Sequence, residues 1–312
     1  MDTPTTPGAS LLTAAGTAGR ARQGVGFLRG KRFQEMVWLG FVLVVVVLGS
    51  AGMLFPIFWM ATTSLKESGD ILLLPPKWIP IPPQWQNYPD ALDFMRATVV
   101  FGNTILVTIA SLIGDVCSAS VVAYAFARLR APGKNVLFML VLSSLMIPYQ
   151  VRLIPEYLLF AGKVLPFINW VDTLLPLIVP AYFGSAFYIF LLRQFYQTVP
   201  LEMDDAAKID GASYLQILWH IMIPMSLPAL GAIAIFSFVN NWNDFFRPLI
   251  YLTSRHVWTV AIALRSFTAE YGATPWNLLM AASLTALIPL VVVFFVAQRY
   301  FIQGIVITGL KG

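Results

Sequence analysis

Long uncharged stretches alternate with short polar segments along most of this chain. The uncharged stretches are residues 37–60, 101–127 (interrupted by Asp115), 136–151, 173–192, 221–239 and 276–297. Most approach the ~20 apolar residues that a helix needs to cross a bilayer. They lack the two-residue alternation of a membrane β-strand and are about twice its length. The pattern predicts an all-α polytopic membrane protein with six transmembrane helices.

The pattern also divides the chain into segments. Residues 1–35 are rich in Thr, Gly, Ala and Pro, so we expect a disordered cytoplasmic tail. Residues 36–300 form the predicted six-helix transmembrane domain, and residues 301–312 form a cytoplasmic C-terminal tail. The stretch 136–151 is short and contains Pro148, so we expect it to tilt into its neighbours or to be lengthened by snorkelling of Arg152.

Composition excludes a soluble globule. The 312 residues are 58% hydrophobic and 11% charged, whereas soluble proteins are about 25% charged. Six spans leave no room for a sizeable aqueous catalytic domain. The single cysteine, Cys117, cannot form a disulfide within the chain.

Basic residues indicate the orientation. The net charge is +5, and the clearest clusters are in the N-terminal segment and in the turn that holds Arg128, Arg130 and Lys134. Because short cytoplasmic loops are enriched in Lys and Arg, both termini are predicted to be cytoplasmic. No basic run is typical of a nucleic-acid site.

The segment 199–224, between the fourth and fifth predicted spans, is too long for a simple hairpin. Pro200 suits the first position of a helix, acidic residues follow it, and Asp210-Gly211 can end that helix in a left-handed conformation. A second helix carries Leu215, Leu218, Trp219 and Met222 at helical spacing. The segment is therefore predicted to be a cytoplasmic loop of two short helices and a turn, a shape that fits a groove on a partner protein.

The same segment resembles the EAA loop of the permease subunits of bacterial ABC importers. The residues that carry the resemblance are Asp205-Ala206-Ala207, Asp210-Gly211-Ala212 and Ile223-Pro224, with Asp205 and Ile223 replacing a glutamate and a leucine of the motif. Similar motifs are Asn103-Thr104, the stretches 123–130, 190–195, 242–245 and 298–301, and the terminal Lys311-Gly312. Together these resemble the smaller membrane subunit of maltose-type carbohydrate importers over almost the whole membrane chain.

The resemblance implies partners and roles. Its partners would be a second permease subunit, an ATPase dimer and an extracytoplasmic sugar-binding protein in a bacterial or archaeal plasma membrane. The coupling loop would dock into the ATPase through Glu202, Asp205, Ala206, Ala207, Asp210 and Gly211. The alternative is an amphipathic helix on lipid, which its acidic first turn disfavours at an anionic surface. Lys311 and Gly312 would also contact the ATPase, or else belong to a frayed terminus.

ATP chemistry is expected in the partner. A phosphate-binding loop needs Gly-x4-Gly-Lys followed by Ser or Thr, and the nearest approach, Gly304 to Gly309, is followed by Leu310 instead of lysine. His220 and His256 are isolated, so no metal site is predicted. The chain is thus predicted not to be an enzyme and to hold no cofactor, with ATP and Mg²⁺ bound by the ATPase subunit.

Polar residues in or near the spans are candidates for the solute path. Tyr149, Gln150, Asn240, Asn241 and Asn243 can line the path or bond neighbouring helices. Asp115 is predicted to be a structural carboxylate bonded to Ser111 or Ser118, in preference to a proton relay, because no second intramembrane carboxylate or histidine accompanies it. By resemblance, Glu270, Tyr271 and Thr274 would reach the binding protein, although Gly272 and Pro275 favour a turn there in any case.

The predicted function is ATP-driven import of a di- or oligosaccharide or related polyol, with the chain coupling closure of the ATPase to inward translocation. A glycerol-phosphate-like solute is a further possibility, although no span contains the Arg or Lys that a phosphate favours. The alternative is a secondary transporter or channel that works alone. An intramembrane enzyme is a third hypothesis, and no paired nucleophile and base in the spans supports it.

Overall fold

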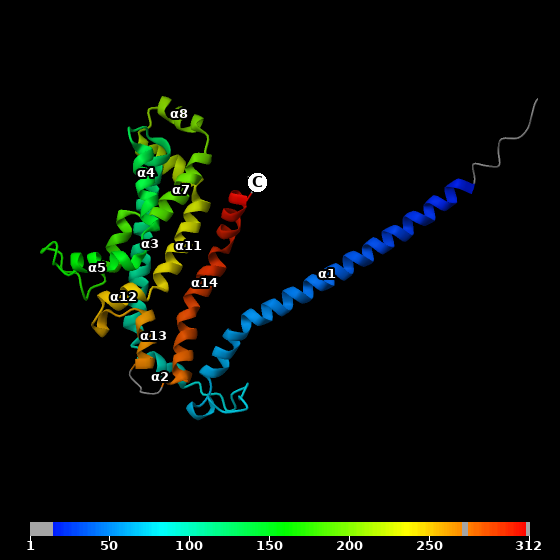
Figure 1. Ribbon diagram of the computed structural model, residues 1–312, viewed down its shortest axis with the longest axis horizontal. Coiled ribbons are helices and arrows are strands. Elements are labelled where there is room, and N and C mark those ends of the chain that lie inside the picture. The colour runs from blue at the N-terminus through cyan, green and yellow to red at the C-terminus, as the bar shows by residue number, and fades with distance from the viewer. Residues whose placement is uncertain (1–14, 270–273, 310–312) are drawn as a thin grey trace, which may run out of the picture. The chain divides into compact units, whose positions relative to one another are not determined.

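Helices make up all the regular structure in the part of the chain that the computed structural model describes (Figure 1). The backbone is described for residues 15–269 and 274–309, and side chains for residues 33–268 and 274–298. The α-helices are α1 (Ala15–Ser64), α2 (Asn87–Phe94), α3 (Ala97–Arg128), α4 (Lys134–Ser143), α5 (Tyr149–Phe160), α6 (Leu175–Ile178), α7 (Ala186–Thr198), α8 (Leu201–Ile209), α9 (Tyr214–Ile217), α10 (Ile223–Met225), α11 (Leu227–Trp242), α12 (Phe246–Tyr251), α13 (Val260–Ala269) and α14 (Trp276–Gly309). Short 3₁₀ or π turns are η1 (Ser68–Asp70), η2 (Ser144–Met146), η3 (Val179–Phe183), η4 (Leu218–Met222) and η5 (Arg255–Val257).

The described helices confirm the all-α membrane fold class. Four stretches are long and apolar enough to cross a bilayer: Phe33–Ser64, Ala97–Arg128, Leu175–Thr198 and Trp276–Gln298. Two further candidates are pairs of helices bent at a short break, Lys134–Met146 with Tyr149–Phe160 and Tyr214–Met225 with Leu227–Trp242. The described part therefore contains four to six candidate spans, and the predicted six corresponds to counting each bent pair as one.

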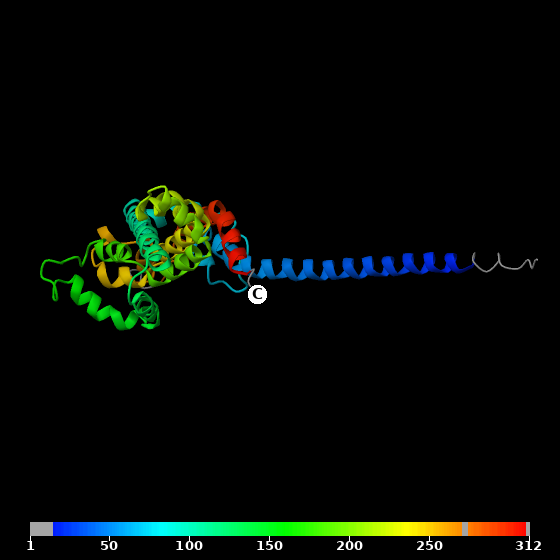
Figure 2. The same ribbon diagram turned by 90° about the horizontal axis from the view of Figure 1, so that it is seen from above.

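The first bent pair corrects the prediction for residues 136–151. The helix stops at Met146, Ile147 is extended, and α5 begins at Tyr149 after a bend of 100°. The cause is Pro148, which has no N–H to donate and disfavours helical geometry in the residue before it. Instead of a tilted continuous span, the chain turns sharply, and α5 lies to one side of the bundle in both views (Figures 1 and 2).

The second bent pair shifts the start of the fifth predicted span. We predicted that span from residue 221, but α11 runs from Leu227 to Trp242 and follows an 80° bend at Ser226. Pro224 and Pro228 flank this bend. Because each proline removes a backbone donor, the helix breaks between them and α11 begins afresh.

Toward both ends of the chain, helix extends past the predicted segment boundaries at residues 35 and 300. The chain divides into two compact units, Met1–Met60 and Ala61–Gly312. In the first, α1 is helical from Ala15, where we predicted disorder up to residue 35. In the second, α14 continues to Gly309, beyond the predicted boundary at residue 300. The reason is that helix propagation adds one hydrogen bond per residue, and no proline interrupts residues 15–55 or 290–309.

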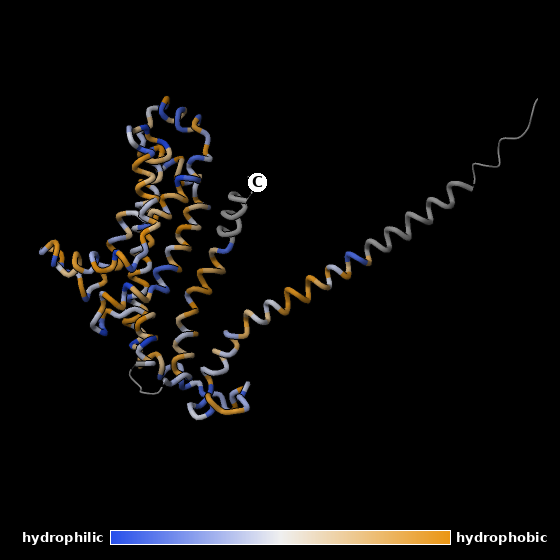
Figure 3. Tube along the Cα trace, in the orientation of Figure 1, coloured by the Kyte–Doolittle hydropathy of each residue, from blue (hydrophilic) through white to orange (hydrophobic). Residues whose placement is uncertain are grey.

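Helix α3 lies at the centre of the second unit. It packs against α7, α11 and η3, while α14 packs against α11 and α2 (Figure 1). Small residues allow the close approach: Ala119 and Ala123 have no exposed surface, and a Cβ on Gly114 would lie 2.7 Å from the Tyr182 ring. The long helices are mostly hydrophobic along their length (Figure 3), as expected for surfaces that face one another or lipid.

Candidate functional site

The segment 199–224 forms the predicted pair of short helices at one end of the bundle (Figure 1). Helix α8 ends at Ile209, and Gly211, two residues later, has a φ of +82°, which confirms the predicted left-handed stop. Amide N–H groups of Gly211 and Ala212 donate to the carbonyls of Lys208 and Ala207, the paired hydrogen bonds of a Schellman cap. Pro200 precedes the first helical residue, one position earlier than predicted.

A capping box starts the next helix. The Gln216 side chain accepts a hydrogen bond from the Ser213 amide at 2.7 Å, and the Ser213 hydroxyl accepts one from the Gln216 amide at 3.4 Å. These bonds satisfy donors that a helix N-terminus otherwise leaves free. The turn between α8 and α9 is thus defined on both sides, by the Schellman cap and by the capping box.

Most of the predicted coupling residues point away from the bundle. Glu202, Asp205, Ala206, Asp210 and Gly211 are exposed. Ala207 is the exception, because it is 9% exposed and packs in the apolar cluster that joins α3 and α7. Of the two alanines that we expected to dock into the ATPase, Ala207 therefore packs against the bundle, and Ala206 is open to another surface.

Large apolar side chains accompany the exposed acids. Leu201, Ile209, Leu215 and Trp219 are each at least 58% exposed. Leu218 and Met222, on the other side of the second helical stretch, are buried against the bundle. A mixed acidic and apolar surface at the end of a bundle is typical of a protein interaction site.

A buried ion pair holds α8 to the bundle. Arg128 Nε lies 3.3 Å from Asp204 Oδ2, and the two side chains are 4% and 3% exposed. Arg128 Nη2 also donates a hydrogen bond of 2.7 Å to the Val199 carbonyl. The adjacent pair of Lys208 and Asp205, 3.1 Å apart, is exposed and belongs to α8 alone. Asp204 and Asp205 therefore have opposite environments although they are neighbours in the chain.

Asp115 is hydrogen bonded, as predicted, but to a different partner. Its Oδ2 accepts a bond of 2.7 Å from the Ser237 hydroxyl of α11. The Ser111 hydroxyl donates to the Leu177 carbonyl, and Ser118 donates to backbone carbonyls. The predicted serines are thus occupied by main-chain acceptors, and the carboxylate joins α3 to α11.

A chain of polar groups continues from Ser237. The Asn241 amide donates to the Ser237 hydroxyl at 3.2 Å, and Arg247 Nη2 donates to Asn241 Oδ1 at 3.0 Å. Arg247 Nε pairs with Asp244 Oδ2 at 2.5 Å. Asn241 is therefore committed to hydrogen bonds within the protein.

The other predicted path residues are only partly brought together. Asn240 donates to the Tyr188 hydroxyl of α7 at 3.2 Å, which fits a helix-bonding role. Tyr149 packs edge-on against Phe246, with 6.0 Å between ring centroids. Gln150 and Asn243 are exposed, and Asn243, the residue after α11, donates to the Val239 carbonyl of that helix.

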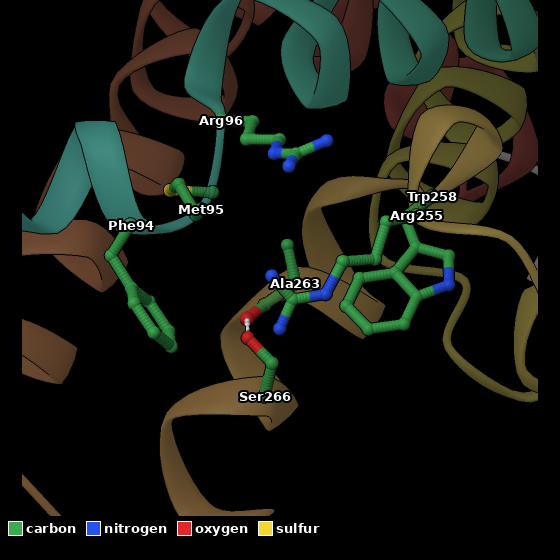
Figure 4. Close-up of a pocket in the computed structure, with 7 residues that line it drawn as sticks. All are labelled: Phe94, Met95, Arg96, Arg255, Trp258, Ala263 and Ser266. Carbon is green, nitrogen blue, oxygen red and sulfur yellow. Dashed lines mark hydrogen bonds between the residues drawn. The ribbon is translucent and has the colours of Figure 1, made fainter. Parts of the chain in front are cut away.

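A small recess is lined by residues of α2, η5 and α13 and by their chain neighbours (Figure 4). Helices α2 and α13 lie at the opposite end of the bundle from α8 (Figure 1). The lining of the recess includes Arg96, from the residue before α3, and Arg255, whose guanidinium stacks on Trp258 at 5.4 Å from the ring centroid. Thr274 is partly exposed just before α14. The other predicted contact residues, Glu270, Tyr271, Lys311 and Gly312, lie outside the described residues. Among the side chains that are described, no group of three His, Cys, Asp or Glu could hold a metal ion.

At Asp172, a loop between α5 and α6 is fastened to the segment after α12. The carboxylate accepts hydrogen bonds from the amides of Thr253 and Ser254, at 2.9 Å and 2.7 Å, and from the Ser254 hydroxyl. The Asp172 amide donates to the Tyr251 carbonyl at 2.7 Å, and its own φ is +63°. Hydrogen bonds to the charged form hold the pKa of the Asp172 carboxyl well below its ordinary value of 3.8.

Replacing Asp172 with asparagine should lower the thermal stability of the protein near neutral pH. Asparagine keeps the shape and tolerates the left-handed backbone but has no charge. Because the folded-state pKa of Asp172 is depressed, its contribution is complete above the unfolded value of 3.8 and is lost as pH falls through the folded value. Unfolding temperatures measured in detergent from pH 7 downwards should therefore differ most at neutral pH and converge in acid. A constant difference at all pH values would contradict this.

Several of these residues were not found from the sequence. Asp204, Arg128 as its partner, Ser237 and Asp172 all act through contacts between distant segments. One usable signal was present, since Asp204 and Ala207 are three residues apart and so share a helix face. That spacing separates the buried face of α8 from the exposed face that carries Asp205.

Comparison with known proteins finds relatives that are all membrane components of transport systems. The family described as binding-protein-dependent transport system inner membrane component matches residues 116–307. The sn-glycerol-3-phosphate transport system permease protein UgpE of Yersinia enterocolitica is 31% identical over 85% of this chain and 95% of its own length. The arabinooligosaccharides transport system permease protein AraQ of Bacillus subtilis is 30% identical over 83% and 91%.

A solved structure has the same fold. It is a chain of a bacterial ABC transporter involved in the import of the acidic polysaccharide alginate. The TM-score is 0.71 at 20% sequence identity, and the match covers 95% of this chain and 100% of the other. At this level of identity the likeness shows that the two chains share a fold.

Proposed function

This chain belongs to the family of binding-protein-dependent transport system inner membrane components and is a permease subunit of an ABC importer. From this premise, we propose the partners, the solute and the coupling mechanism. It pairs with a second permease subunit, an ATPase dimer and an extracytoplasmic binding protein. It conducts a sugar, or a related polyol or polyol phosphate, inward across the bacterial membrane. ATP and Mg²⁺ bind to the ATPase subunits, and this chain carries out no chemistry.

The segment 199–224 is the surface that receives the ATPase. Its exposed face combines acids, such as Glu202 and Asp205, with the apolar Leu201 and Ile209. Acids disfavour an anionic lipid surface, whereas apolar anchors within a polar rim suit a protein groove. The buried contacts of Val199, Ala207, Ile217, Leu218 and Met222 support movement of the segment together with the bundle.

The α8 end of the bundle faces the cytosol in this proposal. Arg128, Arg130 and Lys134 gather at that end, which fits the excess of basic residues in cytoplasmic loops. Binding of ATP closes the ATPase pair, displaces the segment 199–224 and opens the path outward to accept solute. Hydrolysis then resets the bundle and releases solute inward.

The observation that carries this proposal is the exposed two-helix segment with its capped turn, set on a bundle of the importer family. The test is transport by vesicles that contain the complete complex purified through a tag on this chain. Labelled sn-glycerol 3-phosphate and arabinotriose serve as probes, because one relative is named for transport of sn-glycerol 3-phosphate and the other for transport of arabinooligosaccharides. We expect uptake of at least one probe that requires both MgATP and the binding protein.

The matched control is vesicles with this chain alone, which should take up neither probe. Solute movement without any ATPase would favour the alternative of a stand-alone transporter or channel and would overturn the proposal. Purification that never retains an ATPase subunit from native membranes would count against it equally.

A further inference from the structure

Helix α8 has few side-chain attachments to the rest of the protein. Only Asp204 and Ala207 are buried among its residues. Ala207 contributes a methyl group, whose packing has no preferred direction. Asp204 forms the ion pair with Arg128, 3.3 Å away, with both side chains almost completely buried. Among the side chains that the structure describes, this ion pair is therefore the one charged attachment between α8 and the bundle.

Arg128 joins three elements at one point. It is the last residue of α3, it pairs with Asp204 of α8, and its Nη2 donates to the carbonyl of Val199, which caps the end of α7. A planar guanidinium with five donors suits such a junction, whereas a lysine presents a single charged point.

The pair resists separation because it is buried. Among the described residues Asp204 Oδ1 has no hydrogen-bond partner, so Arg128 is the only cation that compensates this carboxylate. Charges attract more strongly in the protein interior than in water, and an unpaired buried charge is costly. A displacement of α8 should therefore carry Arg128, and the end of α3, with it.

The other end of α3 is bonded to the segment that begins α13. The Asn103 amide donates to the carbonyls of His256 and Trp258, at 2.9 Å and 3.0 Å. The Thr104 hydroxyl accepts a bond of 2.9 Å from the Val260 amide. A movement applied at Arg128 thus reaches residues 255–260 through a single helix.

We propose that Arg128 and Asp204 are positioning residues that pass movement of α8 to α3 and, through α3, to the far end of the bundle. This inference rests on the proposed function, because the movement originates in the ATPase. The ion pair acts as a brace between α8 and the end of α3. We assign neither residue a contact with solute or nucleotide, because both side chains are almost completely buried.

Hydrogen–deuterium exchange of the complete complex in lipid nanodiscs tests the brace without any sugar. Exchange is compared with and without MgATP and orthovanadate, which trap the closed ATPase. In the unaltered complex we expect trapping to change exchange both in residues 199–224 and in residues 255–268. In Arg128→Met we expect the change in 199–224 to persist and the change in 255–268 to fall at least about fivefold, the lower end of typical couplings between sites.

Two further variants separate positioning from folding. Arg130→Met is the matched control, since Arg130 is exposed two residues beyond Arg128, and it should respond like the unaltered complex. The double variant Arg128→Met with Asp204→Leu replaces the pair by apolar groups, a change that commonly preserves stability. It keeps the experiment decisive if Arg128→Met fails to assemble, and it should also lose the response in 255–268.

The outcomes are distinct. A normal response of residues 255–268 in Arg128→Met, or in the double variant, would overturn the brace and leave the proposed function intact. An unaltered complex with no ATPase, or with no response in residues 199–224, would instead contradict the proposed function.

Discussion

Replacing Asp204 with alanine should lower the free energy of unfolding of this permease by about 3–5 kcal/mol, the range for breaking a buried ion pair. The substitution removes the carboxylate and leaves the Arg128 guanidinium, 4% exposed, without its counter-charge. The Val199 carbonyl remains as an acceptor for Nη2, but it carries no net charge. Equilibrium unfolding of the purified protein in mixed detergent micelles measures the loss.

Asp205→Ala provides the matched control one residue away. Asp205 also has a basic partner, Lys208 at 3.1 Å, but its side chain is 69% exposed. Exposed pairs of this kind contribute only about 0.3–0.5 kcal/mol, so the control should be nearly as stable as the unaltered protein. Equal losses in the two variants would show that burial of Asp204 has no energetic consequence.

Replacing Gly211 with valine should reduce solute uptake at least about fivefold while leaving the protein in the membrane. A left-handed valine costs about 1–2 kcal/mol, which is enough to reduce the population of the native turn relative to distorted turns at least about fivefold. Gly211 has a φ of +82°, which a β-branched residue adopts poorly. No atom lies within 4 Å of a Cβ built there, so the cost comes from the backbone of the turn and not from a clash. Uptake by vesicles and retention of the ATPase are the measurements.

Gly133→Val is the matched control that separates the effect of backbone strain in general from the effect of strain in the α8–α9 turn. Gly133 has a φ of +74° and equally open surroundings, but it lies before α4, outside the segment 199–224. The same strain there should leave uptake close to that of the unaltered complex. Gly211→Asn should also retain most uptake, because asparagine tolerates a left-handed backbone. If Gly133→Val abolished uptake as fully as Gly211→Val, the α8–α9 turn would have no special role in transport.

The predictions that succeeded depend on short stretches of chain. Uncharged runs predicted helices long enough to span a bilayer, and Asp210-Gly211 predicted the left-handed end of α8. Pro148 indicated a departure from a straight helix, although its consequence is a sharp bend rather than a tilt. Each conclusion follows from hydrophobicity or from backbone preferences over a few residues.

The corrections concern how distant segments meet. Ser111 and Ser118 were reasonable partners for Asp115 because they lie on neighbouring turns, yet the carboxylate bonds Ser237. Ala206 and Ala207 looked equivalent, and only packing against α3 and α7 distinguishes the buried one from the exposed one. Sequence spacing limits which faces can meet but does not say which of several faces will be covered.

Local patterns in the chain were thus enough to establish that this is a helical membrane protein, which stretches are long and apolar, and that a two-helix segment with a glycine turn lies between two of them. The packing of the folded chain was needed to learn that Arg128 and Asp204 form a buried pair, that Asp115 joins α3 to α11, and that Asp172 fastens two loops. The reason is physical. Helix formation depends on bonds between near neighbours, whereas the partner of a buried charge depends on which helices pack together.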